Sequence, residues 1–202
     1  MKVTLIDYGA GNVPSVERAL QRLGAETQRT NDAACVGNAQ ALLLPGVGHY
    51  SALVRALDEL RLRAVLIDAI ARGLPFLGIC LGLQVLFSAS DEAPDLQGLK
   101  LFPGRVCALP GTAKLPHMGW NQISSKRESR LLDGIATDSY FYFAHSYAVP
   151  AVDFPASATC AYSAEFAAVI EQKNIFAVQF HPEKSSEAGA RLLRNFLKLA
   201  AA

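Results

Sequence analysis

The sequence lacks both an excess of charge and any long hydrophobic run. Lysine and arginine number 19 and aspartate and glutamate 18, so the formal net charge of the 202 residues is only +1. The two signs are interspersed, which gives no basic surface of the kind that binds nucleic acid or anionic membranes. A membrane-spanning helix needs about 18 or more consecutive apolar residues, and no run approaches that length. We therefore expect neither nucleic acid nor a membrane as a partner.

Cysteine is also scarce. Cys35, Cys80, Cys107 and Cys160 are scattered along the chain without a Cys-x-x-Cys pair. This distribution argues against a zinc site or a disulfide framework and favours a reducing compartment. The acid at Asp7 interrupts the first apolar residues too early for a signal peptide. We therefore expect a cytoplasmic protein.

The motifs of cofactor and metal sites are missing as well. Residues 7–12 form a turn between a predicted strand and a predicted helix, as phosphate-binding loops do. The turn lacks the second and third glycines of the dinucleotide fingerprint and any Walker lysine-serine pair. His49, His117 and His145 do not have metal-ligand spacing and are interpreted as structural or interface residues. No nucleotide, other cofactor or metal is expected.

The first half of the chain alternates short apolar runs with longer amphipathic ones. Strands are predicted at residues 2–6, 41–44 and 75–79, and helices at residues 13–23, 53–70 and 83–87. The helix over residues 53–70 is expected to break near Leu60. Strand, turn and helix repeating in this order favour a parallel sheet with helices on both faces.

The second half is richer in strand signals. Strands are predicted at residues 139–143, 158–162, 167–171 and 175–180, and a final helix at residues 186–199. Residues 91–130 give the weakest pattern, in which short strands and loops are not separated. We therefore expect an α/β fold with an open, mostly parallel, twisted sheet, helices on both faces, and additional antiparallel strands in the second half. All of it is expected to form a single domain over residues 1–202.

The most informative segment is Gly78-Ile79-Cys80-Leu81-Gly82, between a predicted strand and a predicted helix. This is a nucleophile elbow with cysteine in place of serine, and its sharp turn favours glycine on both sides. Such a turn exposes the sulfur at the carboxyl edge of the sheet. The start of the helix favours a thiolate and offers the Leu81 N–H to a developing oxyanion. The alternative is a buried structural cysteine, which is our interpretation of the other three cysteines.

A thiolate nucleophile needs a group that takes up a proton and returns it to the leaving amine. His181 follows the apolar strand predicted over residues 175–180, so parallel pairing would place it at the same edge as Cys80. Pro182 ends that strand. Glu183 can accept the second imidazole N–H and so fix the tautomer, as the acid of a Ser-His-Asp triad does. Alone, His-Pro-Glu also fits a surface turn; the cysteine elbow upstream favours the catalytic interpretation.

These segments carry a resemblance to a known family. Residues 78–84 (Gly-Ile-Cys-Leu-Gly-Leu-Gln) and 179–183 (Gln-Phe-His-Pro-Glu) resemble class-I, triad-type glutamine amidotransferases, in which a cysteine attacks the side-chain amide of glutamine. Further stretches resemble one branch, the glutaminase subunits of imidazole glycerol phosphate synthase: residues 7–12, 45–49, 116–121, 142–147 and 181–185. The resemblance covers residues 6–196. Ala10 and Leu83 depart from it, since methionine is more frequent there in the family.

The resemblance implies a flavodoxin-like fold, glutamine as the substrate, and a set of site residues. The implied catalytic triad is Cys80, His181 and Glu183. The implied oxyanion donors are the backbone N–H groups of Leu81 and, after the Gly46–Val47 peptide turns, Val47. The implied glutamine-binding residues are Gly46, Gly48, Gln84, Ser146 and Tyr147. The implied contacts with a partner, a (β/α)₈ cyclase that forms imidazole glycerol phosphate in histidine biosynthesis, are Asn12, Trp120, Asn121 and Lys184.

Simpler interpretations remain open for some of these positions and for the function. Residues 45–48 can be only a tight connection, Trp120 a core or surface-patch aromatic, and Lys184 a solvated charge. The same glutaminase chemistry can serve another synthase, such as those making anthranilate, GMP or pyridoxal phosphate. A peptidase or thioesterase of this fold, or a non-catalytic binding module, are the further alternatives.

Overall fold

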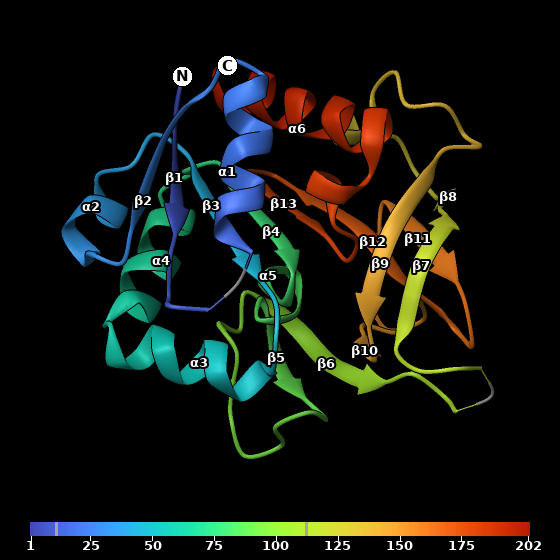
Figure 1. Ribbon diagram of the computed structural model, residues 1–202. Helices are drawn as coiled ribbons and strands as arrows, with labels where there is room; N and C mark the ends of the chain where they lie inside the picture. The colour runs from blue at the N-terminus through green and yellow to red at the C-terminus, as the bar shows by residue number, and fades with distance from the viewer. Residues whose placement is uncertain (11, 112) are drawn as a thin grey trace.

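The computed structural model describes residues 1–10, 12–111 and 113–202; Gly11, within the turn expected over residues 7–12, and Thr112 lie outside the described residues. Within them, eight strands form one sheet, in the order β2 (Glu26–Thr30), β1 (Lys2–Ile6), β3 (Leu42–Gly46), β4 (Phe76–Cys80), β13 (Ile175–Val178), β12 (Glu165–Gln172), β11 (Ala158–Ala161) and β8 (Ser124–Ser125). Pairing is parallel from β2 to β13 and antiparallel from β13 to β8. The predicted mostly parallel sheet with added antiparallel strands is confirmed (Figure 1).

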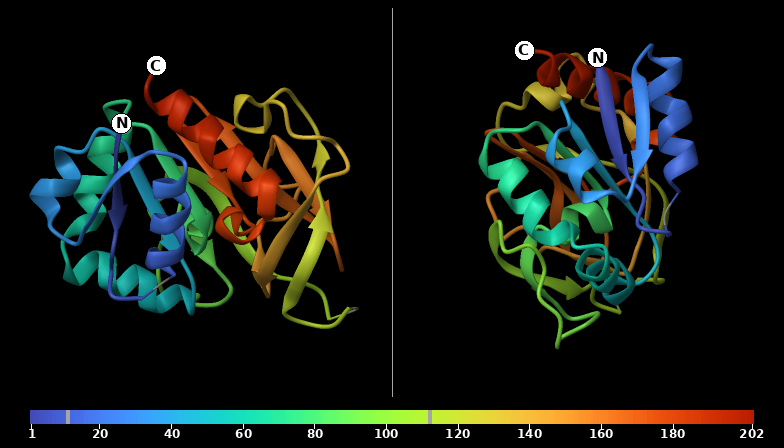
Figure 2. Two further views of the ribbon diagram at one scale, coloured as in Figure 1. Left: turned by 45° about the horizontal axis from the view of Figure 1, so that its top comes forward. Right: turned by 90° about the vertical axis from the view of Figure 1, so that its left-hand side faces the viewer.

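Helices cover both faces of this sheet, as Figure 1 and Figure 2 show. One face carries α1 (Val13–Arg22) and α6 (Ser186–Ala200), and the other α2 (Ala33–Gly37), α3 (Tyr50–Glu59) and α4 (Leu62–Ala71). Successive side chains of a strand point to opposite faces, so Val3 and Leu5 of β1 join the core under α1 and α6 while Ile6 joins the other core. Because both faces are buried, the central strands are apolar almost throughout. Among the described residues, no helix has the length and apolar composition of a membrane span.

Smaller sheets are formed by strands between residues 87 and 148. Within the described residues, β5 (Phe87–Ser90), β6 (Phe102–Ala108) and β10 (Tyr147–Ala148) form one sheet, and β7 (His117–Gln122) and β9 (Tyr140–His145) form an antiparallel pair. Short 3₁₀ turns are found at η1 (Arg130–Leu132) and η2 (Pro182–Lys184). The β7–β9 pair lies beside the carboxyl end of β13, because the His181 N–H donates to the Tyr142 carbonyl oxygen of β9 at 2.8 Å.

Some predicted elements differ from the structure. The expected break near Leu60 is confirmed: α3 and α4 are separate helices, and Arg61 between them has a φ of 57°. A helix follows the elbow as predicted, but α5 (Leu81–Gln84) begins earlier than residue 83 and is a single turn; its predicted continuation to residue 87 is wrong, since Phe87 begins β5. The Phe87 ring packs at 5.5 Å from Phe102, so its apolar character belongs to the small sheet. β2 escaped prediction because it is a polar strand at the sheet edge.

The turn between β4 and α5 packs backbone against backbone. A Cβ atom at Gly82 would overlap the Leu44 carbonyl oxygen of β3, and one at Gly78 would overlap the Gly82 carbonyl oxygen. A Cβ atom at Gly46 would overlap that of Leu81. Only glycine permits these approaches, and they fix the position of the residue between β4 and α5.

Replacing Gly82 with alanine tests this packing. Gly82→Ala is expected to lower the free energy of unfolding by about 2 kcal/mol or more, because overpacking costs roughly 1–3 kcal/mol and here the obstacle is backbone. Gly37→Ala in α2 is the matched control, since its Cβ would meet Val65 at an ordinary 3.5 Å and should change stability by less than about 1 kcal/mol. Urea unfolding followed by circular dichroism measures both. Equal stability of the two variants would contradict a rigid elbow.

Candidate active site

Cys80 occupies the bend between β4 and α5. Its backbone has φ 56° and ψ −108°, outside the regions that L-residues normally adopt. Such strain costs about 1–3 kcal/mol and persists only where the surrounding packing enforces it. The glycine contacts of the elbow supply that packing. They hold Cys80 at the carboxyl edge of the sheet, in the wall of a cavity of about 320 Å³.

β13 brings His181 to the same edge. It pairs in parallel with β4, with Val178 opposite Ile79, so the residues that follow the two strands emerge side by side. His181 comes three positions after Val178 and lines the same cavity as Cys80. The two side chains are close enough for Cys80 to raise the pKa of the imidazole. The structure thus brings together the two side chains that the sequence suggested would meet.

Glu183 holds the other side of the His181 ring. Its Oε1 lies 3.0 Å from His181 Nδ1, and the side chains of the pair are only 3% and 1% exposed. Glu183 Oε2 is buried and has no hydrogen-bond partner among the described residues. A buried carboxylate beside an imidazole favours a proton on that imidazole. Glu183 therefore makes Nδ1 a donor and leaves Nε2 for Cys80.

The His181 pKa is raised from 6.5 to about 10. Burial by itself lowers the pKa of this imidazole, but the interactions with Cys80 and with the Glu183 carboxylate raise it by more. The imidazolium is therefore the stable form at neutral pH, between a sulfur and a carboxylate. A protonated histidine beside the sulfur is the setting in which a cysteine acts as a nucleophile.

The cavity gathers most of the residues expected at the site. Its lining includes Asn12, Val47, Gly48, Cys80, Leu81, Gln84, Ser146, Tyr147, His181 and Lys184. Gly46 is not in the lining and packs beneath the elbow instead. Trp120 and Asn121 lie outside the cavity, on β7. The volume is at the lower end of the range for ligand sites and suits a molecule of amino-acid size.

Gln84 presents a free acceptor in this lining. Its Nε2 donates to the Tyr147 carbonyl oxygen at 2.8 Å and to Gln179 Oε1 at 3.0 Å, which fixes the orientation of the amide. Its Oε1 is buried and has no partner among the described residues. An unpaired buried acceptor is costly, so this oxygen is available to accept from a ligand in the cavity.

The two expected oxyanion donors are not equally available. Leu81 is the first residue of α5, so its N–H has no acceptor within the helix. The Val47 N–H, by contrast, donates to the Tyr8 hydroxyl at 3.3 Å. In this structure the second donor is therefore already engaged, away from the cavity.

Several residues at the site were not singled out from the sequence, among them Gln179, Glu92 and Tyr8. Gln179 is completely buried and its Nε2 lies 3.5 Å from Cys80 Sγ. Glu92 lines the cavity, and its Oε2 accepts from the Tyr50 N–H at 2.9 Å. Tyr8 contacts Val47. Of these, only Gln179 had a usable signal, since a polar residue before His181 interrupts an otherwise apolar strand.

His117 and His145 form a neutral pair at the cavity, which His145 lines. His117 Nδ1 lies 3.1 Å from His145 Nε2, and His145 Nδ1 lies 3.0 Å from the Tyr147 carbonyl oxygen. Burial lowers the pKa of His117 to about 4 and, with the nearby His117 and His181, that of His145 to about 3. Throughout the described ranges, no group of three or more histidine, cysteine or acidic side chains is arranged to hold a metal.

The β7–β9 pair exposes apolar side chains next to the cavity. Met118, Trp120 and Tyr140 are 64%, 51% and 54% exposed. The Trp120 ring packs edge-on against Tyr142, and Lys184 Nζ lies 5.4 Å above the Tyr142 ring. The Asn121 amide, however, donates to the Ala161 carbonyl oxygen at 3.1 Å. This face is of the kind that marks a protein contact.

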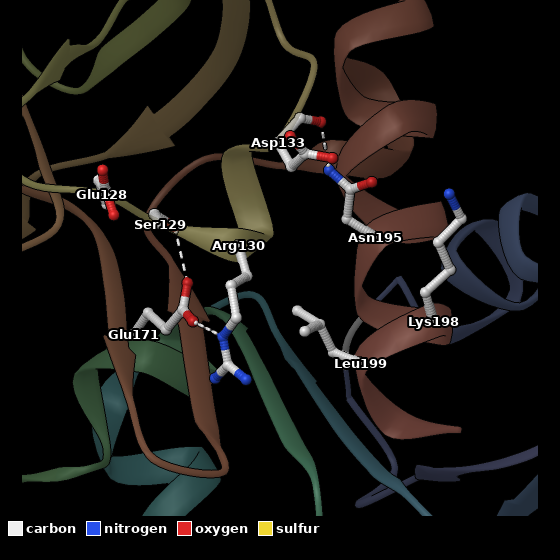
Figure 3. A pocket seen from close by; sticks show the side chains of 8 residues that line it. All are labelled: Glu128, Ser129, Arg130, Asp133, Glu171, Asn195, Lys198 and Leu199. Carbon is white, nitrogen blue, oxygen red and sulfur yellow. Dashed lines mark hydrogen bonds and ion pairs between the residues drawn. The ribbon is translucent and has the colours of Figure 1, made fainter. Parts of the chain in front are cut away.

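A larger cavity, of about 620 Å³, lies between η1 and α6 (Figure 3). Glu171 in its wall accepts from Arg130 Nε at 2.6 Å, Ser129 Oγ at 2.8 Å and the Leu131 N–H at 3.1 Å. Asn195 donates to the carbonyl oxygens of Leu131 and Asp133. These polar groups anchor η1 to β12 and to α6, and they are not left free for a ligand.

Comparison with known proteins agrees with this geometry. The model of the family "Glutamine amidotransferase class-I" matches residues 4–200. The chain is 49% identical over 198 residues to the imidazole glycerol phosphate synthase subunit HisH of Methanothermobacter thermautotrophicus, covering 98% of each. The chain belongs to the class-I glutamine amidotransferases, and within them to the HisH subunits.

Further similarities are consistent with this family. The HisH subunit of Moorella thermoacetica is 46% identical over 198 residues, which cover 98% of this chain and 94% of that one. A crystal structure of a glutamine amidotransferase matches with a TM-score of 0.76 at 19% identity, covering 99% of both chains. At that identity the structural match bears on the fold alone.

Glu183→Gln tests the electrostatics of the pair. The raised pKa of His181 depends in part on the Glu183 charge, so its loss should move the alkaline fall of glutamine hydrolysis to lower pH. Above that pKa the imidazole has no proton for the leaving ammonia. The pH profile of kcat/KM, recorded between about pH 7 and about pH 11, measures the shift. Glu187→Gln, in the first turn of α6 and outside the cavity, is the control. If the alkaline fall of the pH profile does not shift in Glu183→Gln, Glu183 does not raise the pKa of His181.

Proposed function

We propose that the chain is the glutaminase subunit of an imidazole glycerol phosphate synthase. It hydrolyses glutamine to glutamate and ammonia and delivers the ammonia to a (β/α)₈ cyclase subunit in histidine biosynthesis, in the cytoplasm. The observation that carries this proposal is the Cys80–His181–Glu183 arrangement in a cavity of amino-acid size. The printed names of the relatives support the partner and the pathway.

In the first half-reaction, Cys80 Sγ attacks the side-chain amide carbon of glutamine and forms a C–S bond. The carbonyl oxygen becomes an oxyanion, which the Leu81 N–H stabilises and to which Val47 would add a second donor. The intermediate collapses as His181 transfers its proton to the departing nitrogen, which leaves as ammonia. In the second half-reaction, water attacks the glutamyl thioester, His181 takes the water proton, and the C–S bond breaks to release glutamate.

The cavity provides acceptors suited to the nitrogen atoms of glutamine. Gln84 Oε1 has no partner among the described residues, and Glu92 places a carboxylate in the lining. We assign these two groups to the N–H donors of the substrate, with the α-ammonium matched to Glu92. Gly48, Ser146 and Tyr147 line the same cavity. Gly46 acts indirectly, by letting the strand approach the elbow.

We assign the partner surface to the β7–β9 face and the adjoining cavity rim. Trp120 is its exposed aromatic centre, and Lys184 and Asn12 extend it to the cavity. A partner seated there would cover the cavity opening and receive ammonia without exchange with bulk water. Asn121 contributes through the backbone shape of β7, because its amide is bonded within the chain.

A glutaminase assay with and without the (β/α)₈ cyclase and its ribonucleotide substrate tests the proposal. We expect Cys80→Ala to lower ammonia release by at least about a thousandfold, because the covalent route is lost. Cys35→Ala, at a half-buried site outside the cavity, should retain full activity. A glutamine-mimicking electrophile should label Cys80 and no other cysteine. Ammonia release that the cyclase leaves unchanged would point to a different synthase, and labelling of another cysteine would refute the nucleophile.

Trp120→Ala tests the partner surface. Truncating a buried aromatic anchor of an interface costs roughly 2 kcal/mol or more, so the Kd for the cyclase should rise at least about tenfold. Without the cyclase, labelling of Cys80 by the glutamine-mimicking electrophile should be unchanged. Val152→Ala, at a side chain that is 92% exposed on a different segment, is the control. Calorimetric titration with the cyclase measures both, and an unaltered Kd for Trp120→Ala would place the partner elsewhere.

A further inference from the structure

The Tyr8 hydroxyl contacts both polar atoms of Val47. It accepts from the Val47 N–H at 3.3 Å and donates to the Val47 carbonyl oxygen at 3.5 Å. The Tyr8 side chain follows β1 and is 6% exposed within the hydrophobic core. Burial raises the pKa of this phenol to about 12, so it keeps its proton and can act as donor and acceptor together. Tyr8 therefore fixes the orientation of the backbone at Val47.

This orientation matters because a backbone N–H carries one proton. While the Val47 N–H points to Tyr8, it does not point to an oxyanion held above Cys80. Val47 nevertheless lines the same cavity as Cys80 and Leu81. Glycines flank it, and Gly48 has a φ of +95°. Glycine tolerates a wide range of backbone angles, which makes a turn of this peptide sterically accessible.

We propose that Tyr8 is a positioning residue that holds the Val47 N–H away from the reacting amide until the partner binds. This inference rests on the proposed glutaminase function. It adds the residue that restrains the second oxyanion donor, the Val47 N–H. In the chain alone, Leu81 is then the working oxyanion donor. Binding of the cyclase beside the cavity favours the turned peptide, in which the Val47 N–H leaves the phenol and meets the oxyanion. A partner needs only to outweigh the two hydrogen bonds of Tyr8.

Tyr8→Phe tests the proposal, because it removes the hydroxyl and keeps the ring. Without the cyclase, kcat for glutamine hydrolysis should rise by about two- to tenfold, the equivalent of one neutral hydrogen bond. With the cyclase, kcat should be unchanged, so the activation ratio falls by the same factor. Tyr50→Phe is the matched control: Tyr50 is likewise a buried tyrosine, and its hydroxyl has no partner among the described residues. It should leave both rates as they are.

A second measurement does not depend on activity. Hydrogen exchange of the Val47 amide, followed by NMR in the chain alone, should be faster in Tyr8→Phe than in the wild type and unchanged in Tyr50→Phe. Tyr8→Leu, which also lacks the hydroxyl, should show the same rise in rate and exchange if Tyr8→Phe does not fold. Equal exchange in variant and wild type, or a partner-free rate that falls or stays constant, would overturn the role of Tyr8. Absence of ammonia release from the wild-type chain with its cyclase would instead overturn the proposed function. The exchange measurement would then still show whether the Tyr8 hydroxyl restrains the Val47 N–H.

Discussion

The parallel pairing of β4 with β13 is the interaction on which the candidate site depends. It sets Ile79 beside Val178. This register determines where the residues that follow the two strands, Cys80 and His181, are placed. A slip by one residue would turn the side chains of one strand to the opposite face. The register is held because Ile79 and Val178 both enter the core under α1 and α6, while Ala177 enters the other core. Cys80 and His181 therefore meet only when the sheet is complete, since no local segment contains both.

The same corner of the sheet carries two unfavourable features that support each other. Cys80 has a strained backbone, and Glu183 buries a carboxylate whose Oε2 has no partner among the described residues. The strain is enforced by glycine contacts around the elbow, and the buried charge is matched by the His181 imidazolium. Removing a charge from such a group leaves its partner uncompensated. The raised pKa of His181 is thus a consequence of where Glu183 and Cys80 are held rather than of the imidazole itself.

The elbow and the His-Pro-Glu segment were predictable because each is a local pattern whose chemistry fixes the residue types. The central strands were predictable because burial on both faces leaves a continuous apolar signal. Phe87 was assigned to a helix instead of a strand, because an apolar residue in a short run does not distinguish the two. Glu92 gave no signal, and Tyr8 stood within residues 7–12 with no indication of its role. Their place at the site depends on how segments far apart in the sequence pack, which no local pattern encodes.

The contact between Tyr8 and Val47 bears on how such a site can be slow alone and fast with a partner. An interaction accelerates a reaction only when it is stronger in the transition state than in the ground state. A donor bonded to a phenol in the ground state contributes nothing until it is released. One backbone oxyanion donor is worth about a hundred- to a thousandfold in rate, whereas the hydrogen bonds that restrain it, at 3.3 and 3.5 Å, are weak. A small difference in binding energy at the partner surface can therefore control a large difference in rate, and the nucleophile, its base and its acid need not move.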